Sequence, residues 1–385
     1  MTVETLTQQE VDTNFSLFSQ LEQKEHEQVI ICSEPKVGLR AIIAIHNTTL
    51  GPALGGTRMW TYKSDQEALR DALRLSRGMT YKAAVAGLNL GGGKAVIIGD
   101  PQKDKTEALF RAYGRFIEGL AGRYITAEDV GTSISDMEWV RMETKYVTGI
   151  SRALGGSGDP STVTALGVYM GMKACAHKQF GSDSLKGKKV SIQGAGHVSV
   201  YLAEMLAKEG AKIYICDIFP EKVKKVVERT GAIGVDPDDI YDLDVDIYSP
   251  CALGGTVNSD TIPRIKASII AGSANNQLDT EEIHGPMLID RGIMYAPDYV
   301  INAGGLINVA NELEGYNSNR AHEQASRIYD VILDILNHAE KRGIPTYAAS
   351  NELAEHRLQQ IGRIKEIYAS KSKFSGRLGE LNRSC

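Results

Sequence analysis

The segment from Lys188 to Asp217 constrains the fold of this chain more than any other part of the sequence. A short apolar stretch, KKVSIQ, runs into the glycine-rich turn GAGHVS, then a helical pattern over 198–209 and a second apolar stretch, KIYICD. A strand that passes through such a turn into a helix and then a second strand is typical of a parallel sheet with right-handed crossovers. We therefore predict an α/β fold whose C-terminal half holds a Rossmann-type sheet, covered by helices on both faces.

The same alternation extends in both directions along the chain. We expect a helix in EKVKKVVERTG and further strands in VDIYSP, ASIIAGSAN and IMYAPDYVINAGG, followed by C-terminal helices in RIYDVILDILNHAEKRG and NELAEHRLQQIGRIKEIYAS. Upstream, VGLRAIIAIHN predicts a buried strand, and apolar residues recur at helical spacing over 65–76 and 105–121. Residues 1 to about 28 read as a polar helical lead-in.

Composition excludes several classes of protein. The net charge of −5 argues against a dedicated nucleic-acid surface, and no apolar run approaches the length of about 18 residues that spans a membrane. The N-terminal residues lack the basic start and apolar core of a secretory signal, and the five cysteines form no CxxC pair. Because the eight histidines also show no paired-ligand spacing, we expect a cytoplasmic protein without a metal.

The turn at 194–199 predicts a dinucleotide site. Gly194 permits the tight turn and Gly196 lets the backbone approach a pyrophosphate at a helix N-terminus, while Ser199 replaces the usual third glycine. Such a string alone is equally compatible with a plain tight turn. Asp217 ends the next strand, 217 − 194 = 23 residues on, where a carboxylate is expected to bind the adenosine ribose. This carboxylate would repel a 2′-phosphate, so we predict NAD rather than NADP.

Two lysines in MTYKAAVAGLNLGGGKAVIIGDP indicate a second site. Lys82 and Lys94 are flanked by apolar or flexible residues that suit a solvated face poorly, and three glycines before Lys94 would let a ligand approach the backbone closely. A desolvated ammonium group beside a second cation can lose its proton near neutral pH and act as a base. A glycine loop with two surface lysines is the competing interpretation.

Long motifs give the chain a specific resemblance. GPALGGTRMW, GMTYKAAVAGLNLGGGKAVIIGDP, GRYITAEDVGT, PCALGG, AGSANNQL and APDYVINAGGLINVANE, together with GAGHVS, resemble the amino acid dehydrogenase family of leucine, phenylalanine, valine and tryptophan dehydrogenases over residues 27–365. GPALGGTRMW and GLNLGGGK look most like the leucine members. The resemblance implies NAD-dependent, reversible oxidative deamination of an L-amino acid to a 2-oxo acid and ammonium. It also implies a homo-oligomer, an octamer or a dimer.

The resemblance also implies roles for individual residues. Lys82 would pair with the substrate carboxylate, Lys94 would be the catalytic lysine and Asp129 the proton-transferring carboxylate, although Asp129 alone would read as a helix cap. Asn276 would hold substrate or nicotinamide. The remaining cofactor contacts would come from Thr164, Gly194, Ala195, Gly196, His197, Val198, Ser199, Val200, Asp217 and Asn275. His197 and Ser199 depart from the asparagine and the glycine or alanine more usual in the family.

Substrate choice would depend on pocket volume. The positions implied are Leu54, Gly55, Met79, Gly91, Gly92, Ala127, Thr148, Leu306 and Val309. Aromatic-preferring relatives tend to have glycine where this chain has Ala127, whereas Leu306 also occurs in them. A methylene in such a pocket is worth about 1–3 kcal/mol, so we predict leucine, valine and isoleucine first and phenylalanine or tryptophan as the alternative.

At 385 residues the chain predicts two domains. The loop ALGGSGDPSTV at 153–163 marks the hinge between a substrate-binding and oligomerisation domain, 1–150 with 345–385 folding back onto it, and an NAD-binding domain, 151–344. The substrate would lie in the cleft between them.

Two other classes compete with this interpretation. A 2-hydroxy acid dehydrogenase also needs NAD, but its acid–base histidine has no comparably placed counterpart here. A relative that binds nucleotide without catalysis is the non-enzymatic alternative, and the intact motifs around Lys82, Lys94 and Asp129 argue against it.

Overall fold

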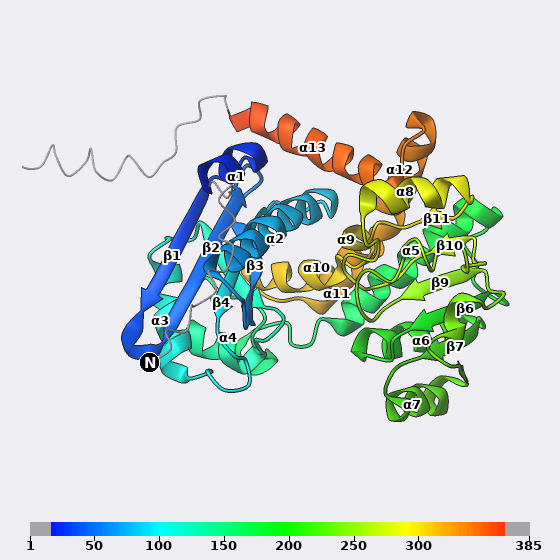
Figure 1. Ribbon diagram of the computed structural model, residues 1–385, viewed down its shortest axis with the longest axis horizontal. Coiled ribbons are helices and arrows are strands. Elements are labelled where there is room, and N and C mark those ends of the chain that lie inside the picture. The colour runs from blue at the N-terminus through cyan, green and yellow to red at the C-terminus, as the bar shows by residue number, and fades with distance from the viewer. Residues whose placement is uncertain (1–16, 366–385) are drawn as a thin grey trace, which may run out of the picture.

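The computed structural model describes residues 17–365, which build two α/β units side by side (Figure 1). The first unit contains a mixed five-stranded sheet in the order β1-β2-β4-β3-β5. Its strands are β1 (Gln28–Glu34), β2 (Leu39–Asn47), β3 (Ala53–Trp60), β4 (Gly91–Ile98) and β5 (Tyr124–Glu128). β1, β2 and β4 pair antiparallel, whereas β4, β3 and β5 run parallel.

Helices cover both faces of this first sheet. They are α1 (Leu17–Lys24), α2 (Asp65–Val85), α3 (Glu107–Glu118) and α4 (Ile134–Arg141), with 3-10 turns at Pro35–Val37 and Arg152–Leu154. α2 packs against β2 and β4, and Ser64 caps its first turn. On the opposite face, Phe110 and Tyr113 of α3 are fully buried against residues of β2 and β3. The helical periodicity predicted over 65–76 and 105–121 is confirmed.

The second unit contains a fully parallel sheet in the order β11-β10-β9-β6-β7-β8. Its strands are β6 (Lys189–Gln193), β7 (Lys212–Cys216), β8 (Ile233–Gly234), β9 (Ile247–Pro250), β10 (Ile269–Ile270) and β11 (Met294–Tyr295). The chain order reverses between β6 and β9, which is the strand order of a dinucleotide-binding fold. The predicted α/β fold with a Rossmann-type sheet in the C-terminal half is confirmed.

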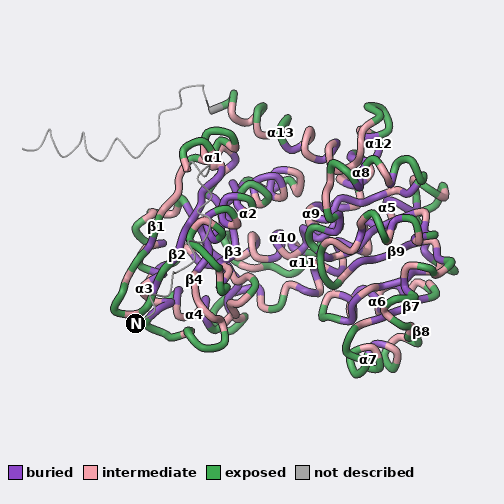
Figure 2. Tube along the Cα trace, in the orientation of Figure 1, coloured by how far each residue is buried: buried purple, intermediate pink, exposed green. Residues whose placement is uncertain are grey.

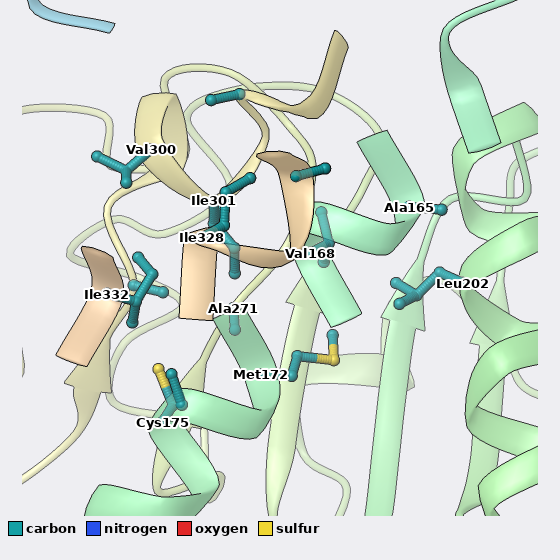
Figure 3. Packing of buried hydrophobic residues seen from close by; sticks show 14 of the residues in the cluster. Ala165, Val168, Met172, Cys175, Leu202, Ala271, Val300, Ile301, Ile328 and Ile332 are labelled. Carbon is teal, nitrogen blue, oxygen red and sulfur yellow. The ribbon is translucent and has the colours of Figure 1, made fainter. Parts of the chain in front are cut away.

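α5 (Ser161–Phe180), which the sequence analysis did not anticipate, forms the centre of the second unit. Val168, Met172 and Cys175 on this helix lie in one buried cluster with Ile301, Ile328 and Ile332 (Figure 3). Gly167 and Gly171 permit this approach, because a Cβ at either position would lie within 2.6 Å of an isoleucine side chain. α5 is buried on most sides (Figure 2), so it lacks the one-sided apolar stripe by which a helix is recognised in a sequence.

The other helices of this unit are α6 (His197–Glu209), α7 (Pro220–Thr230), α8 (Glu281–Asp290), α9 (Asp298–Ile301), α10 (Gly304–Ala310), α11 (Ser318–Ser326) and α12 (Ile328–Arg342), with 3-10 turns at Asp239–Tyr241 and Asn311–Glu314. Two predictions need correction. IMYAPDYVINAGG is a strand only over Met294–Tyr295, since Pro297 precedes the helix α9, and the strand in ASIIAGSAN is limited to Ile269–Ile270.

The last described helix, α13 (Thr346–Lys365), extends from the second unit back to the first and packs on α2 (Figure 1). Arg357 donates to the carbonyl oxygens of Ala84 and Leu88, each at 2.8 Å, and Tyr81 donates to Glu355 at 2.7 Å. These bonds hold the C-terminal end of α2. The domain boundaries at 150 and 345 stay predictions, and what was predicted for residues 1–16 and 366–385 lies outside the described residues.

Within residues 17–365, no helix has the length and apolar character needed to cross a membrane.

Candidate functional site

Three strands of the first sheet bring Lys94, Asp129 and Arg58 together. Nζ of Lys94 lies 3.0 Å from Oδ2 of Asp129, and Nε of Arg58 donates to the same oxygen at 3.0 Å. Side chains alternate between the faces of a strand, and Lys94 in β4, Arg58 in β3 and Asp129 just after β5 share the face covered by α2. Lys94 and Asp129 were both predicted from the sequence as site residues, whereas Arg58 was not.

Burial governs the electrostatics of this group. Only 6% of the Lys94 side chain is exposed, and desolvation lowers the pKa of Lys94 despite the opposing charge of Asp129. Burial alone would raise the pKa of Asp129, but Lys94 and Arg58 more than offset it, so the pKa lies below its ordinary value. Asp129 therefore stays ionised while Lys94 is disposed to release its proton. The Arg58 cation also helps to lower the pKa of Lys94, a contribution that was not predicted from the sequence.

Lys82 lies on the last turn of α2, facing the second unit. Burial lowers its pKa to about 8, opposed by the carboxylate of Asp298 and reinforced by the charge of Lys94. Asp298 begins α9, is buried, and accepts hydrogen bonds from the backbone nitrogens of Gln277 at 3.0 Å and Tyr299 at 2.6 Å. The poorly solvated Lys82 cation thus lies where α2 contacts α9. Asp298 is a second site residue that was not predicted from the sequence.

The glycines around Lys94 are packed against protein. Gly91, Gly92 and Gly93 lie in β4 and are buried, and a Cβ on them would meet the Asn47 carbonyl oxygen at 2.0 Å, the Thr80 nitrogen at 2.0 Å and the Tyr124 ring at 2.6 Å. At Gly55 a Cβ would lie 1.7 Å from the carbonyl oxygen of Gly93. The expectation that these glycines open the backbone to a ligand is wrong for Gly91–Gly93, because neighbouring backbone and side chains fill that space.

Apolar residues from both units form one cluster beside the two lysines. Leu54 of β3 and Leu306 of α10 are buried in it, and Met79 of α2 and Val309 of α10 pack against it. Ala127 and Thr148 are buried nearby at the end of β5, where the Thr148 nitrogen donates to the Thr126 carbonyl oxygen at 2.8 Å. The structure therefore places the predicted pocket residues on facing sides of the junction between the sheets.

A carboxylate from the second unit fixes the connection that follows β5. Glu312 accepts hydrogen bonds from the backbone nitrogen of Gly149 at 3.1 Å and from the nitrogen and hydroxyl of Ser157 at 2.8 and 2.5 Å. Gly149 precedes the segment 153–163 in which the hinge was predicted, and Ser157 lies within it. Glu312 was not anticipated, since nothing local in the sequence relates it to residues 149–157.

The turn after β6 has the form a dinucleotide requires. Gly194 adopts φ +104°, a left-handed conformation that suits glycine, and α6 begins three residues later. At Gly196, which is exposed, a Cβ would meet nothing within 4 Å, so the backbone is open to a ligand there. Asp217 accepts from the Ala195 nitrogen at 2.7 Å, which ties the ribose-binding candidate to the turn. These residues fit a dinucleotide.

Not every residue of the fingerprint faces this opening. Ser199 is fully buried, and Val198 and Val200 pack against the core, which is the close helix–strand packing expected of the third position. The side chain of His197 is 85% exposed, with Nδ1 3.7 Å from Oδ2 of Asp159. The departures at 197 and 199 therefore leave the turn itself intact.

Loops from neighbouring strands meet at the same edge of the second sheet. Atoms of Ala252 would lie 2.9 Å from a Cβ at Gly194, and Gly254 approaches the carbonyl oxygens of Asn275 and Asn276. Asn302 donates to Oδ1 of Asn275 at 2.7 Å. Asn276 is exposed and has φ +51°.

Thr164 lies on the first turn of α5, where its hydroxyl donates to the Pro160 carbonyl oxygen at 3.0 Å and borders Gly305 of α10. No group of three or more His, Cys, Asp or Glu side chains within residues 17–365 is arranged to hold a metal ion.

Comparisons with known proteins agree with this geometry. A family model described as "Glu/Leu/Phe/Val dehydrogenase, dimerisation domain" matches residues 26–146, and one described as "Glutamate/Leucine/Phenylalanine/Valine dehydrogenase" matches 155–217 and 220–363. The chain belongs to this family. It is thereby an amino acid dehydrogenase with a Rossmann-type nucleotide-binding unit, as the resemblance in its motifs predicted.

Individual relatives are similar over nearly their whole length. A leucine dehydrogenase from Geobacillus stearothermophilus is 59% identical over 91% of this chain and 96% of its own, and an L-tryptophan dehydrogenase from Nostoc punctiforme is 49% identical over 91% and 98%. The crystal structure of the Nostoc punctiforme protein superposes with a TM-score of 0.81, covering 90% of this chain and 99% of that one at 48% identity.

Proposed function

We propose that the protein catalyses the reversible, NAD-dependent oxidative deamination of a branched-chain L-amino acid (leucine, valine or isoleucine) to its 2-oxo acid, ammonium, NADH and a proton. The observation that carries this proposal is the Lys94–Asp129 pair, 3.0 Å apart with the lysine buried, in a chain whose second unit has an open glycine turn suited to a dinucleotide. Relatives named leucine dehydrogenase are 57% and 59% identical to the chain, and those named L-tryptophan and phenylalanine dehydrogenase are 47–49% identical.

Each charged residue would have a separate task. The Lys82 cation would hold the substrate carboxylate and orient Cα toward the second sheet. Bound NAD supplies a hydride acceptor for Cα, and the resulting iminium carbon needs a hydroxide equivalent from water. Lys94, which burial disposes to lose its proton, would take a proton from that water, and Asp129 would exchange protons with the departing nitrogen.

The cofactor preference would be set by Asp217. Its carboxylate stands at the end of β7 beside the turn, where a 2′-phosphate would meet like charge. Gly194 to Gly196 would hold the pyrophosphate, and Asn275, Asn276 and Thr164 would border the nicotinamide.

Assembly into a homo-oligomer belongs to the same proposal. The match of residues 26–146 to a model described as a dimerisation domain supports it. Light scattering on the purified protein decides between a dimer and an octamer.

The decisive experiment measures NADH formation from leucine, valine, isoleucine, phenylalanine and tryptophan, and NADH consumption with the corresponding 2-oxo acids, with and without ammonium. We expect the highest kcat/KM for a branched-chain substrate and strict dependence on ammonium. A higher kcat/KM for phenylalanine than for leucine would show that the preferred substrate is an aromatic amino acid. Consumption without ammonium indicates a hydroxy acid dehydrogenase, and no turnover at all indicates a nucleotide-binding relative.

Lys94→Ala tests the mechanism. We expect kcat to fall by roughly 10²–10⁴, the usual contribution of general acid–base catalysis. Lys105→Ala is the matched control, because Lys105 forms another partly buried pair with an aspartate, Asp136, at 2.5 Å in the same unit. Near wild-type turnover of Lys94→Ala would overturn the assignment.

A further inference from the structure

Asp129 shares one carboxylate oxygen between two cations. Oδ2 accepts from Lys94 Nζ and from Arg58 Nε, each at 3.0 Å. The second arm of the same guanidinium is also engaged, since Arg58 Nη1 donates to Oδ2 of Asp71 at 2.9 Å. Arg58 is therefore held at both ends.

Asp71, on α2, is itself fixed from two further directions. The Tyr62 hydroxyl donates to its Oδ2 at 2.8 Å, and Nη2 of Arg74 donates to its Oδ1 at 2.9 Å. Side chains from β3, α2 and the segment between them thus form one network that ends on the oxygen bonded to Lys94.

We propose that Arg58, anchored by Asp71, is a positioning residue for the Lys94–Asp129 pair: it fixes the proton-transferring carboxylate and sets the charge around the lysine. This inference rests on the proposed function. Arg58 keeps its proton under all relevant conditions, so it acts through its two carboxylate partners.

The charges along the network alternate, which gives each a predictable effect on Lys94. The Arg58 cation lowers the pKa of Lys94, and the more distant Asp71 carboxylate raises it. Desolvation remains the largest cause. Removing the Arg58 side chain should therefore raise the proton affinity of Lys94, and removing the Asp71 carboxylate should lower it. A purely structural role would not give shifts of opposite sign.

The far side of Arg58 borders a cavity of about 480 Å³. Trp60, Asp71 and Val130 also line it. Trp60 and Val130 are about half exposed, 48% and 52%, so the cavity opens to solvent. A small planar cation can therefore reach the place of the guanidinium when the side chain is shortened.

The experiment records kcat and KM for leucine deamination against pH in four variants. In Arg58→Ala we expect kcat to fall about a hundredfold, the low end of an acid–base contribution, with KM little changed. The acidic limb of the pH profile of kcat, along which Lys94 loses its proton, should move to higher pH, because Lys94 holds its proton more tightly in this variant. Guanidinium ions at millimolar concentration should restore part of kcat. Arg58→Lys keeps the charge and should leave the limb in place, although one amine bonds both carboxylates less well.

Asp71→Asn should move the acidic limb to lower pH, opposite to Arg58→Ala. Arg111→Ala is the matched control, because Arg111 also bridges two carboxylates. These belong to Glu107 on α3 and to Glu143, which follows α4. It should change neither the pH profile nor the response to guanidinium.

Lost activity in Arg58→Ala without a shifted limb and without rescue would overturn the proposal, as would shifts of the same sign in Arg58→Ala and Asp71→Asn. Should Arg58→Ala fail to fold, the profiles of Arg58→Lys and Asp71→Asn still decide. Failure of the proposed function is a separate result, namely a wild-type protein without leucine-dependent NADH formation.

Discussion

Gly92 passes so close to Thr80 that a Cβ added to the glycine would lie 2.0 Å from the Thr80 backbone nitrogen. Strand β4 and helix α2 therefore meet backbone to backbone at this point. Lys94 follows two residues after Gly92, and Lys82 follows two residues after Thr80. This close approach of α2 and β4 therefore contributes to the separation of the two lysines.

Gly92→Ala should force α2 away from β4. We expect a loss of about 2–3 kcal/mol in the free energy of unfolding, as for overpacked cores, together with a raised KM for the amino acid. Urea unfolding and steady-state kinetics measure both. Gly78→Ala is the control on the same helix, where a Cβ meets nothing within 4 Å, and it should stabilise the protein by about 0.5–1 kcal/mol. Equal stability of Gly92→Ala and wild type contradicts this account.

Ala127→Gly should enlarge the substrate pocket. Ala127 is buried at the end of β5, and removal of one methyl group there is worth about 1–3 kcal/mol in discrimination. We expect the ratio of kcat/KM for phenylalanine over leucine to rise roughly tenfold or more. Ala53→Gly, on the opposite face of the same sheet, should leave the ratio unchanged, and an unchanged ratio in Ala127→Gly would remove this residue from the pocket.

Asp217→Asn should weaken the preference for NAD. In the carboxylate, Oδ2 accepts from the Ala195 nitrogen at 2.7 Å and Oδ1 accepts from the Phe219 nitrogen at 3.0 Å. The single amide oxygen of asparagine can keep the bond to Ala195, which holds the turn, while the bond to Phe219 is lost. Loss of the negative charge removes repulsion of a 2′-phosphate, and we expect the NAD/NADP ratio of kcat/KM to fall at least about tenfold, or 1.4 kcal/mol. Asp244→Asn controls for net charge. A ratio that stays constant in Asp217→Asn argues that another group selects the cofactor.

The binding of 2-oxo acid should weaken above pH 8. Because the pKa of Lys82 is lowered to about 8, its positive charge is present below that pH and is lost as the pH rises through it. KM for the 2-oxo acid should therefore be flat below pH 8 and rise up to tenfold per pH unit above it, approximately as the cationic fraction falls. The oxo acid is the appropriate ligand, since its carboxylate stays ionised and it has no group that titrates in this range. In Lys82→Arg the rise should vanish, and a rise that persists there would assign the titration to another residue.

Sequence reasoning succeeded where the relevant signal is local. The strand KKVSIQ, the turn at Gly194–Gly196 and Asp217 follow one another within the 30 residues 188–217, and each has its own physical reason. Lys94 and Asp129 came from the resemblance of whole motifs. Arg58 was missed although it stood in a quoted motif, since its partner Asp129 is 71 residues away and only the order of the strands brings them together.

Two further misjudgements have a common cause. The glycines before Lys94 read as a ligand-binding loop, and APDYVINAGG read as a strand, because both combine small residues with apolar ones. In the structure both are places of close approach: Gly92 against Thr80, and Gly304 against the carbonyl oxygen of Val163, where a Cβ would lie 2.2 Å away. A single sequence does not show which neighbour occupies the space that a glycine leaves.

Lys94 and Arg58 lie in strands of one sheet and Asp129 directly follows β5 of that sheet, whereas the dinucleotide turn follows a strand of the other sheet. A rocking motion of one unit against the other would therefore change how near the hydride donor and acceptor stand without disturbing the proton relay. Mutations that loosen the packing between the two units should slow hydride transfer and enlarge its isotope effect. The pKa values of Lys94 and Asp129 should stay unchanged in these variants.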